Sequence, residues 1–398
     1  MCYRCLVAGF DTISLSKTHW TSDQLNFRLI PPQQLISPDF QRFTSQQVVR
    51  DGVMDVYLHR PSGRTEINGG GFDRQTIQTL HLDDDLYGFL LNALVELDAL
   101  IDLDFRLVNN PDFADLSFYL DSEINLGDSD GLTLGIALTN NVDGRGFWEV
   151  MLNTPAFGRD ANYLRYAALH EIGHALGLEH PFDDSDGDFF LSRDPWLSAF
   201  PEDTVMAYRS PQGGVWPTAF SANDLAALRL IWGVEFEVSK VPLGQRLIGT
   251  DSDDILIGGP GPDLLRGEFG NDQLIGGGGG DELWGGSGSN LFRSSADGVE
   301  DWIFISRDGS RKISQAAASV DVIRELGSED RIGILGARTK QLRFKPVNLE
   351  SASWGPVDGI GIFAMNRLEA IYTGGDLTRT ELRGVTVGLA ANFTGDLA

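Results

Sequence analysis

Cysteine and long apolar runs are scarce in this chain. Its 398 residues include two cysteines, Cys2 and Cys5, so we expect no disulfide bonds within the body of the fold. No stretch of roughly 18 apolar residues predicts a membrane span. The opening MCYRCLVAGF lacks the apolar run and the cleavage site of a signal peptide. If the protein is exported, we therefore expect a route that does not use a cleaved N-terminal signal.

Basic residues are outnumbered by acidic ones. The chain has 31 Lys and Arg residues against 57 Asp and Glu residues, a formal net charge of −26. Such a charge disfavours nucleic acid and anionic membranes as partners and favours cations. The hydrophobic content of 42% is sufficient for at least one substantial core. These figures indicate a globular protein with no nucleic-acid or membrane partner.

The spacing of apolar residues predicts the elements of an α+β unit with a mixed sheet plus helices. Three stretches repeat apolar residues at helical spacing: 83–102, 162–177 and 221–233. Four stretches alternate as strands do: 103–108, 114–120, 131–138 and 147–152. We predict four regions along the chain, namely an N-terminal arm or pro-segment (1–65), this α+β domain (66–235), a glycine-rich repeat block (245–297) and a mostly β C-terminal region (298–398).

Half of the six histidines lie within ALHEIGHALGLEHP, residues 168–181. His170 and His174 are four residues apart, so on a helix both imidazoles face the same side and can share one ion. Gly177 permits a positive φ that ends the helix, and His180 then returns from the loop as a third ligand. Three neutral imidazoles suit Zn²⁺ and leave one position for water, which is typical of a catalytic zinc site.

Glu171 follows the first of these histidines and is expected to lie beside the metal without binding it. That position suits a general base acting on water. The alternative is an ordinary amphipathic helix that carries surface histidines. The other three histidines, His19, His59 and His81, show no ligand spacing, and we expect them to serve surface or core packing.

The segment HEIGHALGLEH resembles the extended zinc motif of the metzincin metalloproteases, and DTVMAYRS at 203–210 resembles their Met-turn. This resemblance implies a zinc endopeptidase that acts on protein or peptide substrates. It implies roles for six residues: His170, His174 and His180 as zinc ligands, Glu171 as base, Met206 as the apolar floor below the metal, and Tyr208 as the oxyanion-stabilising residue of serralysins and astacins. For Met206 and Tyr208, simple core packing is the alternative.

Five nonapeptides follow one another from residue 249: GTDSDDILI, GGPGPDLLR, GEFGNDQLI, GGGGGDELW and GGSGSNLFR. Glycines near the start of each frame permit a tight turn, and position 8 is always apolar. Four frames place an aspartate at position 6, whose hard oxygen ligands suit Ca²⁺. The expected calcium ligands are Asp254, Asp263, Asp272 and Asp281; the expected core residues are Leu256, Leu265, Leu274, Leu283 and Phe292.

The fifth frame carries Asn290 in place of the acid, so we expect a weakened last site and the cap of the repeat block there. A flexible glycine-rich linker is the alternative, but a linker has no reason to keep Asp and Leu in phase over five periods. Stacked carboxylates repel one another until cations neutralise them. We therefore expect this block to fold only with calcium.

The repeats resemble the repeats-in-toxin parallel β-roll, and a protease domain followed by such a roll resembles serralysin. The resemblance implies an α+β metzincin catalytic domain, then a calcium-binding parallel β-roll, then a mostly β C-terminal region. It also implies a secreted, extracellular monomer that binds Zn²⁺ and Ca²⁺ and leaves by type I secretion machinery.

Three alternatives stay open at this point. The chain could be a calcium-binding surface or matrix protein with a vestigial protease site. It could be a zymogen in which Cys2 or Cys5 caps the zinc. The acidic segment DDSDGD (183–188) could bind another calcium ion, although a solvated acidic loop is the favoured interpretation.

Overall fold

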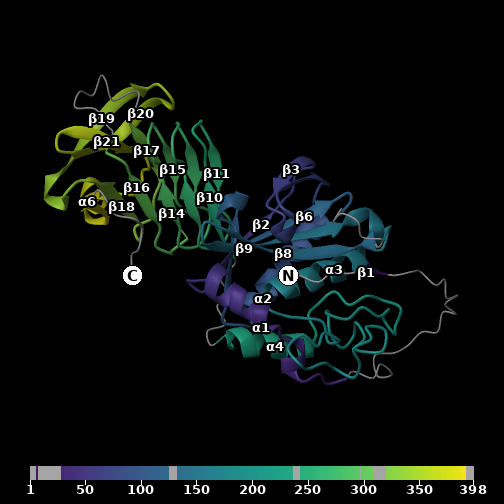
Figure 1. The fold of residues 1–398 in the computed structure, drawn as a ribbon. Helices are drawn as coiled ribbons and strands as arrows, with labels where there is room; N and C mark the ends of the chain where they lie inside the picture. The colour runs from purple at the N-terminus through teal and green to yellow at the C-terminus, as the bar shows by residue number, and fades with distance from the viewer. Residues whose placement is uncertain are drawn as a thin grey trace. The chain divides into compact units, whose positions relative to one another are not determined.

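The computed structural model describes residues 6–7, 28–124, 132–235, 243–295, 297–307 and 320–390. The chain divides into two units (Figure 1). The first unit comprises residues 1–105 and 111–240, and the second comprises residues 106–110 and 241–398. Among the described residues, no helix is both long and apolar enough to cross a membrane.

Three helices of the first unit, α2, α3 and α4, match the predicted helical stretches, whereas α1 and the short helical turns were not predicted. The side chain of Asp83 caps one of them by accepting a hydrogen bond from the Leu86 backbone N–H, and a buried leucine stripe follows at helical spacing. The helices are α1 (Pro38–Phe43), α2 (Asp84–Asp98), α3 (Ala161–Ala175) and α4 (Ala222–Trp232); the short helical turns are η2 (Pro32–Leu35), η3 (Thr44–Val48), η4 (Gly70–Phe72), η5 (Pro111–Phe113) and η6 (Thr154–Phe157).

The sheet of the first unit is mixed, as predicted. Its strands are β2 (Val53–Leu58), β3 (Gly63–Ile67), β4 (Gln75–Thr79), β6 (Leu116–Asp121), β8 (Gly135–Val142) and β9 (Arg145–Asn153). Strand β6 pairs in parallel with β2 and β9, whereas β8 runs antiparallel to β9 and β3 antiparallel to β4. Helix α3 packs against β8 and β9 (Figure 1). This packing places the histidine-bearing helix on a rigid support.

Residues 28–58, which we expected within an N-terminal arm, take part in this fold. Trp148 of β9 is fully buried, and the rings of Phe40 and Phe43 pack edge-on against it at 5.4 and 5.5 Å. The Trp148 indole N–H donates to Thr44 Oγ1, and that hydroxyl donates to the Ala175 carbonyl at the end of α3. Segment 38–48 therefore fixes the C-terminal end of α3 against the sheet.

A short strand pair involves the N-terminal segment. Strand β1 (Leu6–Val7) pairs antiparallel with β7 (Leu132–Thr133), which directly precedes β8.

The second unit contains two stacks of short parallel strands. One stack orders β10 (Gly244–Ile248), β12 (Leu264–Arg266), β14 (Glu282–Trp284), β16 (Trp302–Ile305), β18 (Arg331–Leu335) and β22 (Thr386–Leu389), and residues of β5 (Asp104–Val108) pair with its first strand. The other orders β11 (Ile255–Ile257), β13 (Gln273–Ile275), β15 (Leu291–Arg293), β17 (Asp321–Glu325) and β21 (Arg367–Tyr372). Successive nonapeptides alternate between the stacks, so a strand meets its partner 18 residues later, as Leu265 meets Leu283.

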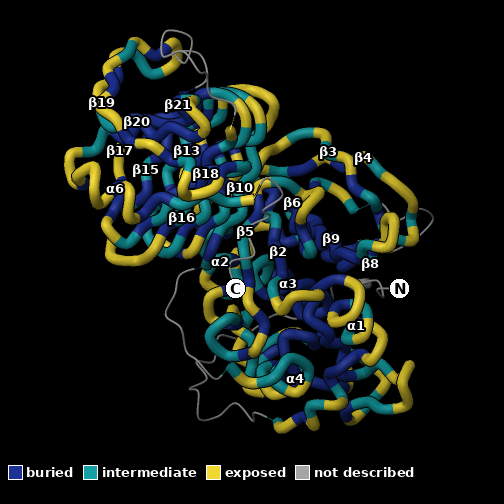
Figure 2. The backbone as a smooth tube through the Cα atoms, turned by 90° about the vertical axis from the view of Figure 1, so that its left-hand side faces the viewer, coloured by how far each residue is buried: buried dark blue, intermediate teal, exposed yellow. Residues whose placement is uncertain are grey.

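The position-8 side chains form the core between the stacks. Leu265, Leu274, Leu283 and Phe292 have 0% exposure and Leu256 has 7%, all in one apolar cluster. Figure 2 shows this interior as a dark blue band along the strands. The predicted core residues of the repeats are thus confirmed.

The prediction that the roll is capped at Asn290 is wrong. Strand β15 just after it pairs in parallel with β17, and β14 likewise with β16, so the stacking continues beyond the five frames. The remaining elements of the unit are η7 (Thr339–Gln341), the antiparallel strands β19 (Leu342–Ser351) and β20 (Gly355–Ala364), and α6 (Arg379–Val385). Parallel pairing therefore continues after the strict nine-residue spacing has ended, with Asn290 bonded to Asp321, 31 residues later.

Candidate metal centres

Helix α3 is delimited by local signals that place its histidines. The Asp160 side chain accepts hydrogen bonds from the backbone N–H groups of Asn162 and Tyr163 at the start of the helix. At the other end, Gly177 has a φ of +106°, and its N–H and that of Leu178 donate back to carbonyls of the last turn. This Schellman arrangement reverses the chain and directs His180 back toward the helix.

The three predicted ligands meet. The Nε2 atom of His180 lies 3.2 Å from the Nε2 atoms of both His170 and His174. Tetrahedral zinc with Zn–N bonds of about 2.0–2.1 Å places its ligand nitrogens about 3.3 Å apart. All three rings are buried, with no more than 4% exposure. The spacing and the donor type therefore fit a three-histidine zinc site.

The outer nitrogen of each helical imidazole is held by a backbone carbonyl. His170 Nδ1 lies 2.8 Å from the Val205 carbonyl oxygen, and His174 Nδ1 lies 2.9 Å from that of Leu178. These bonds place the proton on Nδ1 and direct the Nε2 lone pair inward. Burial lowers the pKa of His170 to about 3 and that of His174 to about 4, and the pKa of His180 is also lowered by burial. The rings are thus neutral, as metal binding requires.

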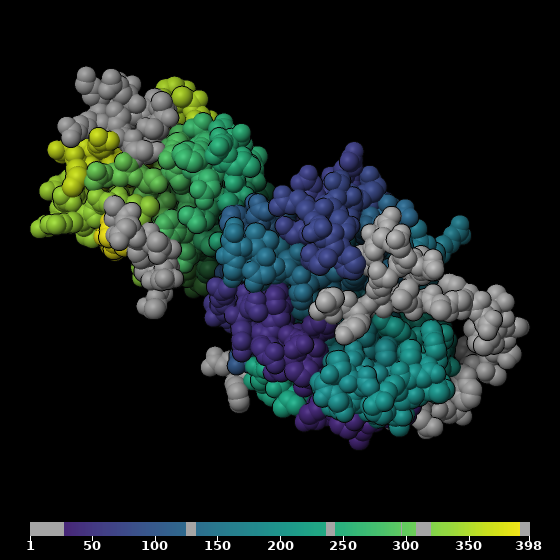
Figure 3. Space-filling view, viewed as in Figure 1, coloured from purple at the N-terminus to yellow at the C-terminus, as the bar shows by residue number. Residues whose placement is uncertain are grey.

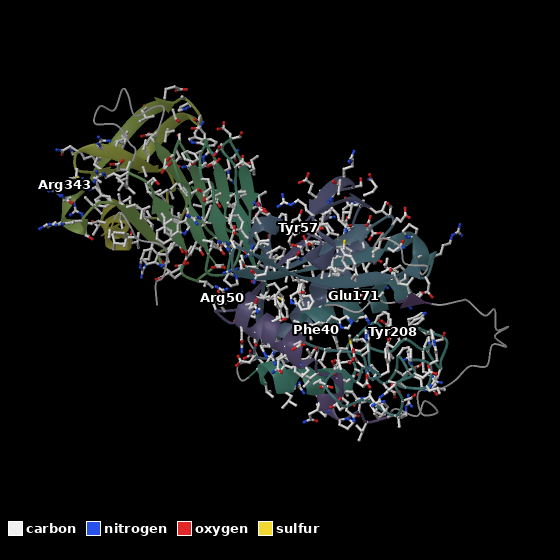
Figure 4. All side chains as sticks on the ribbon, in the orientation of Figure 1. Phe40, Arg50, Tyr57, Glu171, Tyr208 and Arg343 are labelled. Carbon is white, nitrogen blue, oxygen red and sulfur yellow. The ribbon has the colours of Figure 1, made fainter. Side chains whose placement is uncertain are left out.

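Glu171 is 1% exposed and lies beside this group, against the backbone of β8. A Cβ placed on Gly135 would come within 2.6 Å of Glu171 Oε1, so only glycine leaves room for the carboxylate. A pocket beside Glu171 is lined by Leu134, Tyr163, Ala167 and Trp216. Figure 4 labels Glu171 and Tyr208 in this region of the first unit.

Met206 lies directly against α3. It is fully buried, and a Cβ on Gly173 would be 2.8 Å from Met206 Sδ, so the glycine allows close approach of the helix. The two residues before Met206 are held by Asp224 of α4. Its carboxylate accepts hydrogen bonds from Thr204 Oγ1 at 2.5 Å and from the Val205 N–H at 3.0 Å. Sequence reasoning missed Asp224: the capping box that it forms with Ser221 marks the start of α4 but gives no sign of its contact with Thr204 and Val205.

Tyr208 borders the same site. Its ring centroid is 4.7 Å from that of His180 and 5.8 Å from that of His170. Phe182 stacks on His180 from the loop at 4.9 Å. The histidines without ligand spacing are elsewhere: His59 is buried and bonded to Tyr57 and Thr79, His81 is exposed, and His19 lies outside the described residues.

The position-6 residues of the roll form two columns. Each backbone N–H donates to the side chain one full coil later: Asp254 to Asp272, Asp263 to Asp281, and Asp272 to Asn290. The opening glycine of each frame makes room for the carboxylate, since a Cβ on Gly267 would lie 2.3 Å from Asp272 Oδ2.

Three further aspartates extend these columns beyond the predicted set. The bonds continue from Asp281 to Asp301, from Asn290 to Asp321, and from Asp301 to Asp330. Oδ2 atoms of Asp272, Asp281 and Asp301 are buried and have no hydrogen-bond partner within the described residues. Such oxygens suit a cation, because a buried carboxylate without donors or counter-charge is costly.

The columns predict an unusual pH dependence for the calcium-free protein. Burial raises the pKa of Asp281 to about 8, of Asp301 to about 7, and of Asp263 and Asp272 to about 6. These values lie above the pKa of about 3.9 for Asp in an unfolded chain, so the folded roll binds more protons than the unfolded chain. Its stability without calcium is therefore present at low pH and lost as the pH rises through this range.

We expect urea unfolding of the calcium-free chain, followed by circular dichroism, to give a measurable midpoint for the second unit at about pH 5, and a much lower midpoint or a unit that is already unfolded at about pH 8. Saturating calcium should remove most of this difference by favouring the ionised carboxylates. Equal midpoints at both pH values without calcium would contradict the prediction.

Comparison with known proteins identifies one part of the chain. A family model of the RTX calcium-binding nonapeptide repeat matches residues 248–283 and 257–292. No curated protein matches the chain. The second unit therefore carries RTX calcium-binding repeats, and the first unit carries a buried group of three histidines that could bind a metal.

Proposed function

We propose that the chain is a secreted, calcium-stabilised zinc endopeptidase of the serralysin-like metzincin type. The observation that carries this proposal is the convergence of three neutral imidazoles beside the buried carboxylate of Glu171, with the Nε2 atom of His180 3.2 Å from the Nε2 atom of each of the other two. His170, His174 and His180 would hold the zinc ion. The packing of Met206 against Gly173 adds a support of the kind expected from the Met-turn resemblance.

Bound zinc would supply Lewis acidity, which acidifies water and polarises a peptide carbonyl. Glu171 accepts the proton of the attacking water and then delivers it to the departing amine. Tyr208, whose ring lies beside those of His170 and His180, donates its phenol O–H to the developing oxyanion. The carbonyls of Val205 and Leu178 keep the imidazoles oriented throughout.

The pocket next to Glu171 would accept a substrate side chain. Its walls are mainly apolar and aromatic, with Trp216 stacked on Tyr163 at 4.1 Å. Such a lining favours an apolar residue next to the cleaved bond. Strand β7 (Leu132–Thr133), next to Leu134 of the pocket, is paired with β1, so its edge would bind an extended peptide only after β1 is released.

Calcium scarcity in the cytosol and abundance outside would couple folding of the roll to export, which supports the secreted location. Type I secretion remains a proposal on the same grounds. The zymogen hypothesis also stays a prediction. Among the described residues, strand β1 of the N-terminal segment pairs with β7. Cys2 and Cys5, which the hypothesis places on the zinc, lie outside the described residues.

The alternative function is a calcium-binding surface or matrix protein. The match to the RTX repeat supports calcium binding and extends over residues 248–292. It does not require the buried histidines, the carbonyls that orient them, or the neighbouring carboxylate. For that reason we favour the enzyme.

Metal analysis of the purified chain, with peptide-bond cleavage assayed on the same sample, tests the proposal. We expect one zinc ion per chain in addition to calcium, cleavage of denatured casein, and loss of cleavage when a chelator removes zinc while calcium is kept in excess. Calcium without zinc, or zinc without any cleavage of protein substrates, would favour the alternative.

A further inference from the structure

The loop that carries His180 also brings together three carboxylates that the zinc site does not use. Oxygen atoms of Glu179, Asp186 and Asp188 all lie within 4.8 Å of one another. The chain between them is folded back on itself, since the Phe190 N–H donates to the Pro181 carbonyl and the Asp188 N–H to Asp186 Oδ1. Figure 3 shows in teal the part of the first unit's surface to which this region of the chain contributes.

Glu179 is the unexpected member of this carboxylate trio. It is 3% exposed, and its Oε1 atom has no hydrogen-bond partner within the described residues. Its backbone N–H donates to the Leu35 carbonyl, which ties the residue to the segment packed on α3. Asp188 Oδ1 is likewise buried without a hydrogen-bond partner. Two carboxylate oxygens thus lie inside the protein where no donor among the described residues satisfies them, which is costly.

No positive side chain compensates this charge among the described residues. None of the three carboxylates forms an ion pair there, and the nearby cation, Arg193, pairs with Asp184 at 2.6 Å instead. The carboxylates that act on Glu179 electrostatically are Asp39, Asp183, Asp186 and Asp188, so every such neighbour adds negative charge. The trio therefore lacks a positive charge of its own.

We propose that Glu179, Asp186 and Asp188 bind a calcium ion, separate from those of the roll. All the donors are hard carboxylate oxygens. Ca²⁺ prefers such ligands, and they do not favour Zn²⁺ over Ca²⁺. Two ligands on opposite sides of a calcium ion, at about 2.4 Å each, are about 4.8 Å apart, so oxygens within 4.8 Å of one another fit one coordination sphere. Water completes the shell on the exposed side of Asp186.

This ion would act on the neighbouring centre through the chain. Glu179 directly precedes His180, and Asp183 N–H bonds to the His180 carbonyl. Calcium would therefore fix the loop on both sides of the third histidine and keep it in position. The binding itself does not depend on catalysis, so it stands or falls separately from the proposed peptidase activity.

Hydrogen–deuterium exchange on the full chain tests this site without interference from the roll, because the readout is local. The protein is prepared with one equivalent of zinc and compared with and without millimolar calcium. We expect calcium to slow exchange in peptides covering residues 179–193 by about tenfold at a concentration about ten times its Kd. Magnesium at the same concentration should give less protection, because it demands tighter octahedral geometry.

Glu179→Gln and Asp186→Asn should abolish this calcium effect in residues 179–193 while the roll keeps its own. Asp184→Asn is the matched control, since it changes the same loop and removes an acid that lies outside the trio; it should keep the effect. Exchange in β6 and β9 shows whether each variant is folded. The same exchange with and without calcium in the wild-type loop, or full protection in folded Glu179→Gln, would overturn the proposal.

Discussion

Replacing Glu171 with alanine or glutamine is expected to leave one zinc ion bound per chain and to lower kcat/KM for a peptide substrate by about 10²–10⁴. The reason is the division of roles in the site. The three imidazoles converge without the glutamate, whereas its carboxylate lies beside them and against Gly135. Glutamine keeps the shape of the side chain and removes its ability to accept a proton.

The measurement combines zinc content with cleavage rate in each variant. Glu96→Gln is the matched control, because it makes the same chemical change on the exposed face of α2. It should retain both zinc and activity. An alanine variant at Glu171 that cleaves as fast as the wild type would exclude this residue as the base.

Removing calcium is expected to unfold the roll of the second unit at neutral pH. In one column Asp263, Asp281 and Asp301 lie one coil apart. The backbone N–H of Asp263 donates a hydrogen bond to the side chain of Asp281, and that of Asp281 donates to the side chain of Asp301. Without a cation, the buried oxygens repel one another and have no hydrogen-bond donors. Circular dichroism at neutral pH should show loss of β signal on chelation and its recovery when calcium is restored.

A single column variant should shift this transition. Asp281→Asn removes one charged ligand in the middle of a column, so we expect the calcium concentration for half folding to rise about tenfold. Asp358→Asn, an exposed change on β20 away from the columns, should leave it unchanged. A roll that keeps its structure after chelation at neutral pH would contradict the idea that calcium holds it together.

The sequence predicted those parts of the fold and site that depend on local spacing. Helical period and the glycine stop placed His170, His174 and His180 together, and strict nine-residue spacing identified the core leucines of the roll. The predicted strands at 114–120 and 147–152 correspond to β6 and β9. In each case the interacting residues are close in sequence or follow a fixed period, so their spacing is sufficient to predict which residues come together.

The missed residues depend on contacts that no local pattern encodes. Asp224 reaches the turn before Met206 only because α4 packs against it, and Glu179 joins Asp186 only because the loop folds back. Asp321 belongs to the column of Asn290 across 31 residues rather than 18, since the nine-residue spacing is not kept between them. Period-based reasoning fails at such a change of spacing, although the strand beyond it stacks as before.

The alternation of nonapeptides between the two stacks restricts how this roll can change in length. Because a strand pairs with the one 18 residues away, duplicating a single frame would send each later strand of the roll to the opposite sheet. The position-6 residues of the columns and the antiparallel strands β19 and β20 would then lie next to different strands from those they contact now. Insertion or deletion of two frames together keeps every later strand in its own stack. The roll can therefore lengthen by whole coils of 18 residues but not by a single nonapeptide.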